Sequence, residues 1–340
     1  MAFDIHRGVN ASHWLSQSDR RGPERAAYFT EDDVKLIAEL GFDHVRIPID
    51  EEQMWDDAGR QDAEAFDLLD AALDWCGRAG LRAVVDLHIL RTHHFLDGES
   101  SPLWADPHEP RRFADLWRQL SERLRGRAND QVAYELLNEP VAASDDDWNR
   151  VWPAPFAAIR QAEPQRIVVL GSNRWNSVNN FAALTVPDDE HCILTFHFYY
   201  PMLITHYTAP WWKGGGFYDG PVRYPGSPIA PEDFARLPDA ERQALREDNE
   251  PFDAEAMRRL FQAPLAVRQR TAKPLYCGEF GCWDKVDAID PAIRPAWFGD
   301  MIDLLNAEAI PWAVWDYGRG GFGILDADGK PGPVVDVLMR

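Results

Sequence analysis

The stretch Tyr134–Val141, YELLNEPV, has the apolar character of a buried strand until it ends on an amide, a carboxylate and a proline. Seven other short runs of apolar or β-branched residues occur along the chain, and helical patterns separate them. The predicted strands are 6–12, 44–49, 82–88, 133–139, 166–172, 192–199, 275–281 and 311–317. Continuous apolar strands of this kind are typical of a parallel sheet that is covered on both faces.

Helical patterns fill most of the gaps between these strands. Thr30 and Asp33 have the spacing of a capping box at the start of one helix, and Gly41 is the expected cap at its end. Segments 63–80, 110–126 and 295–308 show the same apolar spacing. Strands and helices that alternate in this way predict a (β/α)₈ TIM barrel, here as one catalytic domain over residues 1–340.

Two further features refine this prediction. An open doubly wound sheet, the alternative, usually carries a glycine-rich phosphate loop after its first strand, and none follows here. Pro201 to about Pro251 interrupts the alternation with aromatic, glycine-rich and charged sequence. We expect it to be an elaborated loop after the sixth strand.

Composition limits the classes of partner. The formal net charge of −21 predicts repulsion of phosphate backbones, so we expect neither nucleic acid nor anionic membranes to bind. Neither a secretory leader nor an apolar run of about 18 residues is present, which favours a cytoplasmic protein, or a secreted one whose signal is missing from this sequence. Cys76, Cys192, Cys277 and Cys282 lack zinc-type spacing, and we expect reduced, mostly buried thiols.

Polar or aromatic side chains stand at the ends of most predicted strands. In a TIM barrel these ends meet at one rim, which carries the active site. A salt bridge or core packing could explain any one of them, but their joint position favours a functional site. The rim residues are Asn10, Arg46, His88, Asn138, Glu139, His197, Tyr199, Glu279 and Trp315.

Glu139 and Glu279 indicate the reaction class. Each follows an apolar strand core, where a carboxylate loses hydration and needs partners or a raised pKa. Two carboxyl groups at one barrel mouth are the pair that glycoside hydrolysis requires, one protonated and the other ionised. Arg46 is the expected cation that keeps one of them charged.

These motifs resemble the site of glycoside hydrolase family 5. Arg46 in HVRIP, His88 in VVDLH, NEP at 138–140, HFYYP from His197, CGEFG around Glu279 and WAVWDY around Trp315 occur in the family's order. The resemblance covers essentially the whole chain and is strongest to cellulase C-type endoglucanases. It implies a retaining endo-β-glucanase without cofactor or metal, acting on β-1,4 or mixed-linkage β-1,3-1,4 glucan oligo- or polysaccharides.

The resemblance also implies roles for single residues. Glu139 would be the general acid/base and Glu279 the nucleophile. Arg46 and Tyr199 would hold Glu279, and His197 would lie near Glu139. Substrate would be bound by Asn138 at the sugar 2-hydroxyl, by His88 and by Trp315 stacked beneath the sugar. The predicted substrate-binding set is completed by Arg46, His197, Tyr199, Asn10 at the end of the first strand and Trp212 in a loop.

One loop departs from the family pattern. Relatives commonly carry a second histidine and Ala-Pro-Gly after the third strand, whereas this chain has Ile89 and an unrelated stretch from Leu90 to His94. Substrate preference therefore stays open. Tryptophans in or beside loops predict an open cleft with several sugar subsites. They are Trp14, Trp104, Trp211, Trp212 and Trp283.

Several alternative functions are compatible with these residues. A β-mannanase or an exo-acting β-glucosidase would use the same scaffold, and a non-catalytic carbohydrate-binding barrel would keep it without the chemistry. A metal-dependent hydrolase would use Asp86, His88 and His197, but no His-x-His pair follows the first strand and no bridging lysine is evident. We expect a monomer.

Overall fold

The computed structural model describes residues 3–96, 98–284, 289–318, 321–326 and 328–340. Eight parallel strands follow one another in chain order and close into a barrel, because β8 pairs with β1. The strands are β1 Arg7–Asn10, β2 His44–Asp50, β3 Arg82–Ile89, β4 Val132–Glu135, β5 Val168–Gly171, β6 Cys192–Phe198, β7 Leu275–Phe280 and β8 Trp312–Val314. The predicted (β/α)₈ barrel is confirmed.

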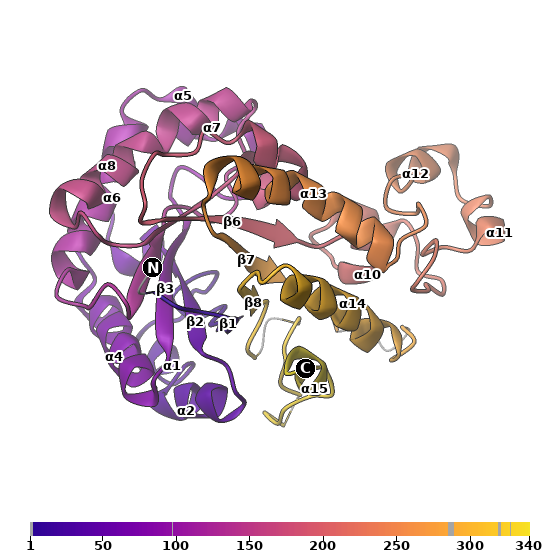
Figure 1. The fold of residues 1–340 in the computed structure, drawn as a ribbon, viewed down its shortest axis with the longest axis horizontal. Helices are drawn as coiled ribbons and strands as arrows, with labels where there is room; N and C mark the ends of the chain where they lie inside the picture. Colours follow the sequence, from indigo (N-terminus) through magenta and orange to yellow (C-terminus); the bar gives the residue numbers. More distant parts are fainter. Residues whose placement is uncertain (1–2, 97, 285–288, 319–320, 327) are drawn as a thin grey trace.

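Helices surround the strands on the outside of the barrel (Figure 1). The α-helices are α1 Gly22–Ala26, α2 Glu31–Glu39, α3 Glu51–Met54, α4 Ala63–Ala79, α5 Pro102–Ala105, α6 Glu109–Leu124, α7 Asp145–Val151, α8 Pro153–Ala162, α9 Asn173–Asn176, α10 Met202–Thr205, α11 Pro231–Phe234, α12 Asp239–Ala244, α13 Ala254–Thr271, α14 Ile293–Ala307 and α15 Val334–Leu338. Short 3₁₀ helices are η1 Gly98–Ser100, η2 Val178–Ala183 and η3 Lys213–Gly216.

The predicted start and end of α2 are confirmed. The Asp33 carboxylate accepts the Thr30 backbone N–H at 2.8 Å, which is half of a capping box. Gly41 follows the helix with a φ of 92°, a left-handed conformation that favours glycine.

The predicted end of the fourth strand is wrong. β4 ends at Glu135, before the Asn138–Glu139 pair. Leu136 and Asn138 still donate one backbone hydrogen bond each, to Val169 at 3.1 Å and to Leu87 at 3.1 Å. Glu139 then has a φ of 45°, a left-handed backbone conformation that does not continue a strand. Such a conformation costs a residue with a side chain about 1–3 kcal/mol, so neighbouring contacts must hold it.

The inside of the barrel changes character along its axis. Val84, Ala133 and Tyr276 belong to a small apolar cluster that is separate from the main core between strands and helices. Alternate residues of a strand share a face, so Asp86 and Glu135 continue the inward faces of β3 and β4 toward the carboxyl ends. The barrel is therefore apolar near the amino ends of its strands and charged near the rim.

The expected elaborated loop after the sixth strand is present. Residues 201–251 join β6 to the segment before α13 and contain α10, η3, α11 and α12. In Figure 1, α11 and α12 lie at the right edge of the view, away from the strands. The single-domain division of residues 1–340 stays a prediction.

The cysteine prediction is confirmed, because Cys76, Cys192, Cys277 and Cys282 are all free and buried. Within the described part of the chain, no helix combines the length and apolar character that crossing a membrane would require.

Asp50 yields a prediction for the pH dependence of stability. Its side chain lies at the end of β2, and Oδ2 accepts the Gln17 backbone N–H at 2.6 Å. Burial raises the pKa of Asp50 from 3.8 to about 7, although bonds from Ser16 and Gln17 oppose the rise. The folded state thus keeps a proton that the unfolded state releases, and its stability falls as pH rises from 3.8 toward 7.

Asp50 should lower the free energy of unfolding by about 1.4 kcal/mol for each pH unit in this range. We expect Asp50→Asn to remove this contribution, because the amide keeps an acceptor for Gln17 and never ionises. Urea unfolding of both proteins between about pH 4 and 8 measures the difference. Parallel stability curves for variant and wild type would contradict the prediction.

Candidate active site

The predicted rim residues meet at the carboxyl ends of the strands. Asn10, Arg46, His88, His197 and Glu279 lie on β1, β2, β3, β6 and β7. Tyr199 and Trp315 directly follow β6 and β8, whereas Asn138 and Glu139 lie three and four residues after the end of β4.

Glu139 and Glu279 form a close carboxyl pair around His197. The His197 Nδ1 lies 2.8 Å from Glu139 Oε1 and 3.5 Å from Glu279 Oε2. One oxygen of each carboxyl group and a ring nitrogen of His197 all lie within 4.8 Å of one another. Two carboxyl groups this close fit the spacing of about 5–5.5 Å in retaining glycosidases, not the 6.5–9.5 Å of inverting ones.

Arg46 is the cation at the centre of the site. Its Nε and Nη2 bind both oxygens of Glu135 at 2.8 and 2.9 Å, and its Nη1 donates to Glu279 Oε1 at 2.7 Å. Nη2 also lies 3.0 Å from Asp86 Oδ2. The guanidinium thus serves three buried carboxyl groups at once.

Two of these carboxyl groups were missed by sequence reasoning. Asp86 had been considered only as a possible metal ligand, and Glu135 had been counted as part of an apolar strand. Both side chains are fully buried. Each could have been found from the sequence as a single charged residue inside an otherwise apolar strand, because a buried charge requires a partner.

Asn10 and Arg46 contact other side chains of the site and do not reach solvent, and their expected place among the substrate-binding residues stays a prediction. Both are fully buried. The Asn10 Nδ2 donates to the Gly278 carbonyl at 3.0 Å, and its Oδ1 accepts from Arg46 Nη1 at 2.9 Å. Asn10 therefore fixes the guanidinium relative to β7.

Burial raises the pKa of both carboxyl groups of the pair. For Glu139 the nearby Glu279 charge adds to burial and holds the pKa well above its usual range. For Glu279 burial is again the largest cause, but Arg46 and the Tyr199 hydroxyl, 3.0 Å from Oε2, limit the rise. Arg46 and Tyr199 lower the pKa of Glu279 as expected, but burial outweighs them and the pKa stays above its ordinary value. The difference within the pair remains: Glu279 ionises first.

The neutral state of His197 adds to this difference. Burial lowers the pKa of His197 well below its ordinary value, so the ring carries no charge. The Asn176 amide nitrogen lies 3.4 Å from Nε2, which leaves the proton on Nδ1, toward Glu139. Asn176 was also missed by sequence reasoning, because it lies on α9 after β5 and no predicted strand end marked it.

His88 and Trp315 form one wall of the site. Their rings stack in parallel with centroids 5.6 Å apart. The His88 Nδ1 lies 2.6 Å from Asp86 Oδ2, and burial lowers the pKa of His88 well below its ordinary value. The Asn138 Oδ1 accepts from Arg46 Nη2 at 2.9 Å, which fixes its amide beside Glu139.

The predicted tryptophan platforms divide into two groups. Trp14 and Trp104 are buried, so the prediction that they line an open cleft is wrong. Trp14 packs on Phe29, and the Trp104 indole N–H donates to the Val141 carbonyl. Their burial depends on which loops pack together, and this is not visible in a local pattern. Trp212 is half-buried against the core, whereas its neighbour Trp211 is 41% exposed and meets Trp283 edge-on.

The donor set that could hold a metal among the described residues is Glu139, His197 and Glu279, the same group as the carboxyl pair. The combination of Asp86, His88 and His197 is not such a group within the described ranges.

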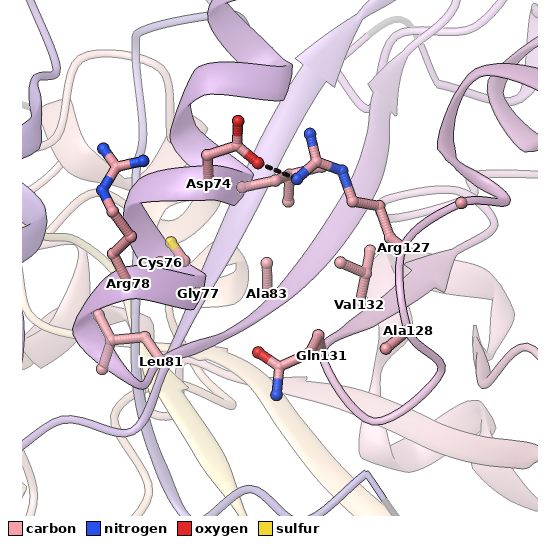
Figure 2. Close-up of a pocket in the computed structure, with 12 residues that line it drawn as sticks. Asp74, Cys76, Gly77, Arg78, Leu81, Ala83, Arg127, Ala128, Gln131 and Val132 are labelled. Atoms are coloured by element: carbon pink, nitrogen blue, oxygen red, sulfur yellow. Dashed lines mark hydrogen bonds and ion pairs between the residues drawn. The ribbon is translucent and has the colours of Figure 1, made fainter.

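A separate pocket of about 410 Å³ lies at the opposite end of the barrel. Figure 2 shows that it opens between the end of α4 and the connection from α6 to β4, with Cys76, Arg127 and Gln131 around it. Arg127 is paired with Asp74. None of the predicted site residues lines this pocket.

Comparison with known proteins identifies the family of the chain. The model of the cellulase family, glycosyl hydrolase family 5, matches residues 8–321. Endoglucanase C of Acetivibrio thermocellus is 32% identical over 338 residues, which cover 98% of this chain and 97% of that protein. Cellodextrinase A of Ruminococcus flavefaciens is 31% identical and is matched over 84% of this chain and 78% of its own length.

Solved structures share the fold. Cel5A of Thermotoga maritima in complex with cellobiose has a TM-score of 0.75 at 22% identity, over 98% of this chain and 97% of that one. The predicted glycoside hydrolase is confirmed: the chain belongs to the cellulase family, glycosyl hydrolase family 5.

Proposed function

We propose that this enzyme is a retaining endo-β-glucanase that hydrolyses β-1,4 or mixed-linkage glucans. The observation that carries the proposal is the carboxyl pair within 4.8 Å, whose two members have unequal partners. A guanidinium and a phenol contact Glu279, whereas a neutral imidazole contacts Glu139. Endoglucanase C, which matches the chain almost end to end, supports the substrate class.

In the first step Glu279 is the nucleophile and Glu139 the acid. The Glu279 carboxylate forms a bond to the anomeric carbon while the bond to the leaving oxygen breaks, and Glu139 gives its proton to that oxygen. The negative charge thus passes from Glu279 to Glu139. His197 Nδ1–H, 2.8 Å from Glu139 Oε1, stabilises the carboxylate that forms there.

In the second step the roles reverse. Glu139 takes a proton from water as the water oxygen attacks the anomeric carbon, and the bond to Glu279 breaks. Both residues return to their starting states, and two inversions retain the configuration. No cofactor is needed for either step.

Neighbouring groups bind the sugar in this proposal. Asn138 offers its amide nitrogen to the 2-hydroxyl, since Arg46 already occupies its oxygen. Trp315 and His88 form the wall beneath the ring. The role of Trp212 as a further contact rests on its place in the loop after β6. We also propose that the enzyme acts as a monomer, either in the cytoplasm or after secretion.

The first test compares polymers. We expect cellulosic and mixed-linkage β-glucans to be hydrolysed faster than mannan, with a rapid loss of viscosity that marks internal cleavage. Faster hydrolysis of mannan would favour a β-mannanase, and release of glucose from chain ends without loss of viscosity would favour an exo-acting β-glucosidase. EDTA should leave the rate unchanged, and loss of activity with recovery on adding Zn²⁺ would favour a metal-dependent hydrolase.

The second test separates the two glutamates. Glu279→Ala should lower kcat by at least about 10³-fold on every substrate, and azide should restore turnover with inverted product. Glu139→Ala should lower kcat/KM by about 10²–10⁴-fold on glucans but little on aryl glycosides with acidic leaving groups, which need no protonation. Equal losses of kcat/KM on both substrate types would contradict the acid role of Glu139.

The third test concerns Arg46. Arg46→Ala removes a group that favours ionised Glu279, so the acidic limb of the kcat/KM profile should move to higher pH. Arg46→Lys should reverse the shift only in part, because an ammonium lacks the planar fork. Stability should also fall by about 3–5 kcal/mol, since three carboxyl groups lose their cation. A lower Tm with an unmoved acidic limb would indicate a structural role alone.

A further inference from the structure

The loop that departs from the family pattern forms a tight turn beside the proposed acid/base. Leu90 and His93 exchange both backbone hydrogen bonds, at 3.0 and 3.1 Å. The turn carries the His93 side chain inward, where it is 1% exposed. Histidine is a polar residue that is not usually buried to this extent, so a specific contact must account for its burial.

That contact is the backbone of Glu139. The His93 Nε2 lies 3.3 Å from the Glu139 carbonyl oxygen, and the tautomer with hydrogen on Nε2 donates to it. The Trp104 ring packs against His93 with centroids 5.1 Å apart, and its indole N–H donates to the Val141 carbonyl at 2.7 Å. Two side chains of the region after β3 therefore hold the segment that carries Glu139.

The opposite side of the segment is held by the region after β5. The Trp175 backbone N–H donates to the Pro140 carbonyl at 3.3 Å, and the Asn173 amide donates to the Ala142 carbonyl at 3.2 Å. Each of the four consecutive carbonyls from Glu139 to Ala142 thus has a donor from one of two flanking loops. Only the donor to the Glu139 carbonyl acts on the residue with the positive φ of 45°.

We propose that His93 is a positioning residue for Glu139, and that the divergent loop supplies this function in the present chain. The proposal rests on the acid/base role of Glu139. His93 holds the backbone carbonyl of Glu139, whose positive φ is unfavourable. This contact sets the direction in which the Glu139 side chain points. A displacement of about 1 Å at the acid is enough to slow proton transfer about 10²-fold.

The test measures dependence on the leaving group. We compare kcat/KM for aryl β-cellobiosides with dinitrophenol and with unsubstituted phenol as leaving groups, because only the second needs a proton from the acid. His93→Leu should lower kcat/KM about 10–100-fold for the phenyl substrate and less than about threefold for the dinitrophenyl substrate. His93→Gln places an amide N–H near the position of Nε2 and should restore much of the loss.

Two further variants complete the design. His108→Leu is the matched control: this histidine is exposed at the start of α6, and both rates should stay at wild-type values. His93→Asn keeps a polar side chain that is too short to reach the carbonyl, so it should reproduce the loss if His93→Leu fails to fold. Equal losses on the two substrates, or no recovery in His93→Gln, would overturn the positioning role.

Failure of the proposed function has a different signature. Glu139→Gln must show the strong leaving-group dependence by itself. If Glu139→Gln lacks it, the acid/base assignment is wrong whatever the His93 variants do. If Glu139→Gln shows it and His93→Leu does not, only the role of His93 is wrong.

Discussion

The burial of one guanidinium among three carboxyl groups is the constraint on which the site depends. Arg46 contacts Asp86, Glu135 and Glu279, which come from three different strands. One positive charge cannot balance three negative charges in a desolvated interior, so protons must be retained there. The raised pKa of Asp86, about 7, follows from its burial, which Arg46 only partly offsets.

This arrangement also explains how two chemically identical glutamates come to differ. Glu279 lies on β7 within reach of the guanidinium, whereas Glu139 lies past the end of β4, where its partner is an imidazole that burial keeps neutral. The proton is therefore retained on Glu139 because of its position in the barrel. The same separation of roles would be lost if Arg46 contacted both carboxyl groups equally.

The rim residues were predictable because parallel strands place their carboxyl ends at one edge, so the last polar residue of each strand indicates the site. The roles of Asp86 and Glu135 were not predictable. When a strand is treated as one continuous apolar run, its sequence does not indicate which of its positions point into the barrel. Trp14 and Trp104 were misplaced since burial of an indole depends on contacts between loops distant in sequence. The end of β4 was misjudged because nothing in YELLNEP specifies the positive φ at Glu139.

The position of Arg46 also connects folding to chemistry. Its hydrogen bonds reach β1 through Asn10, β4 through Glu135 and β7 through Glu279. No two of these three strands are adjacent in the barrel, so the side chain connects separate parts of its wall. Such contacts form only when the barrel is closed in the correct register, because a shift of one residue would turn these side chains outward. The geometry that sets the ionisation of the glutamate pair is thus available only in the closed barrel. The unfavourable buried charges must be offset by the apolar packing between strands and helices, which the rim itself does not supply.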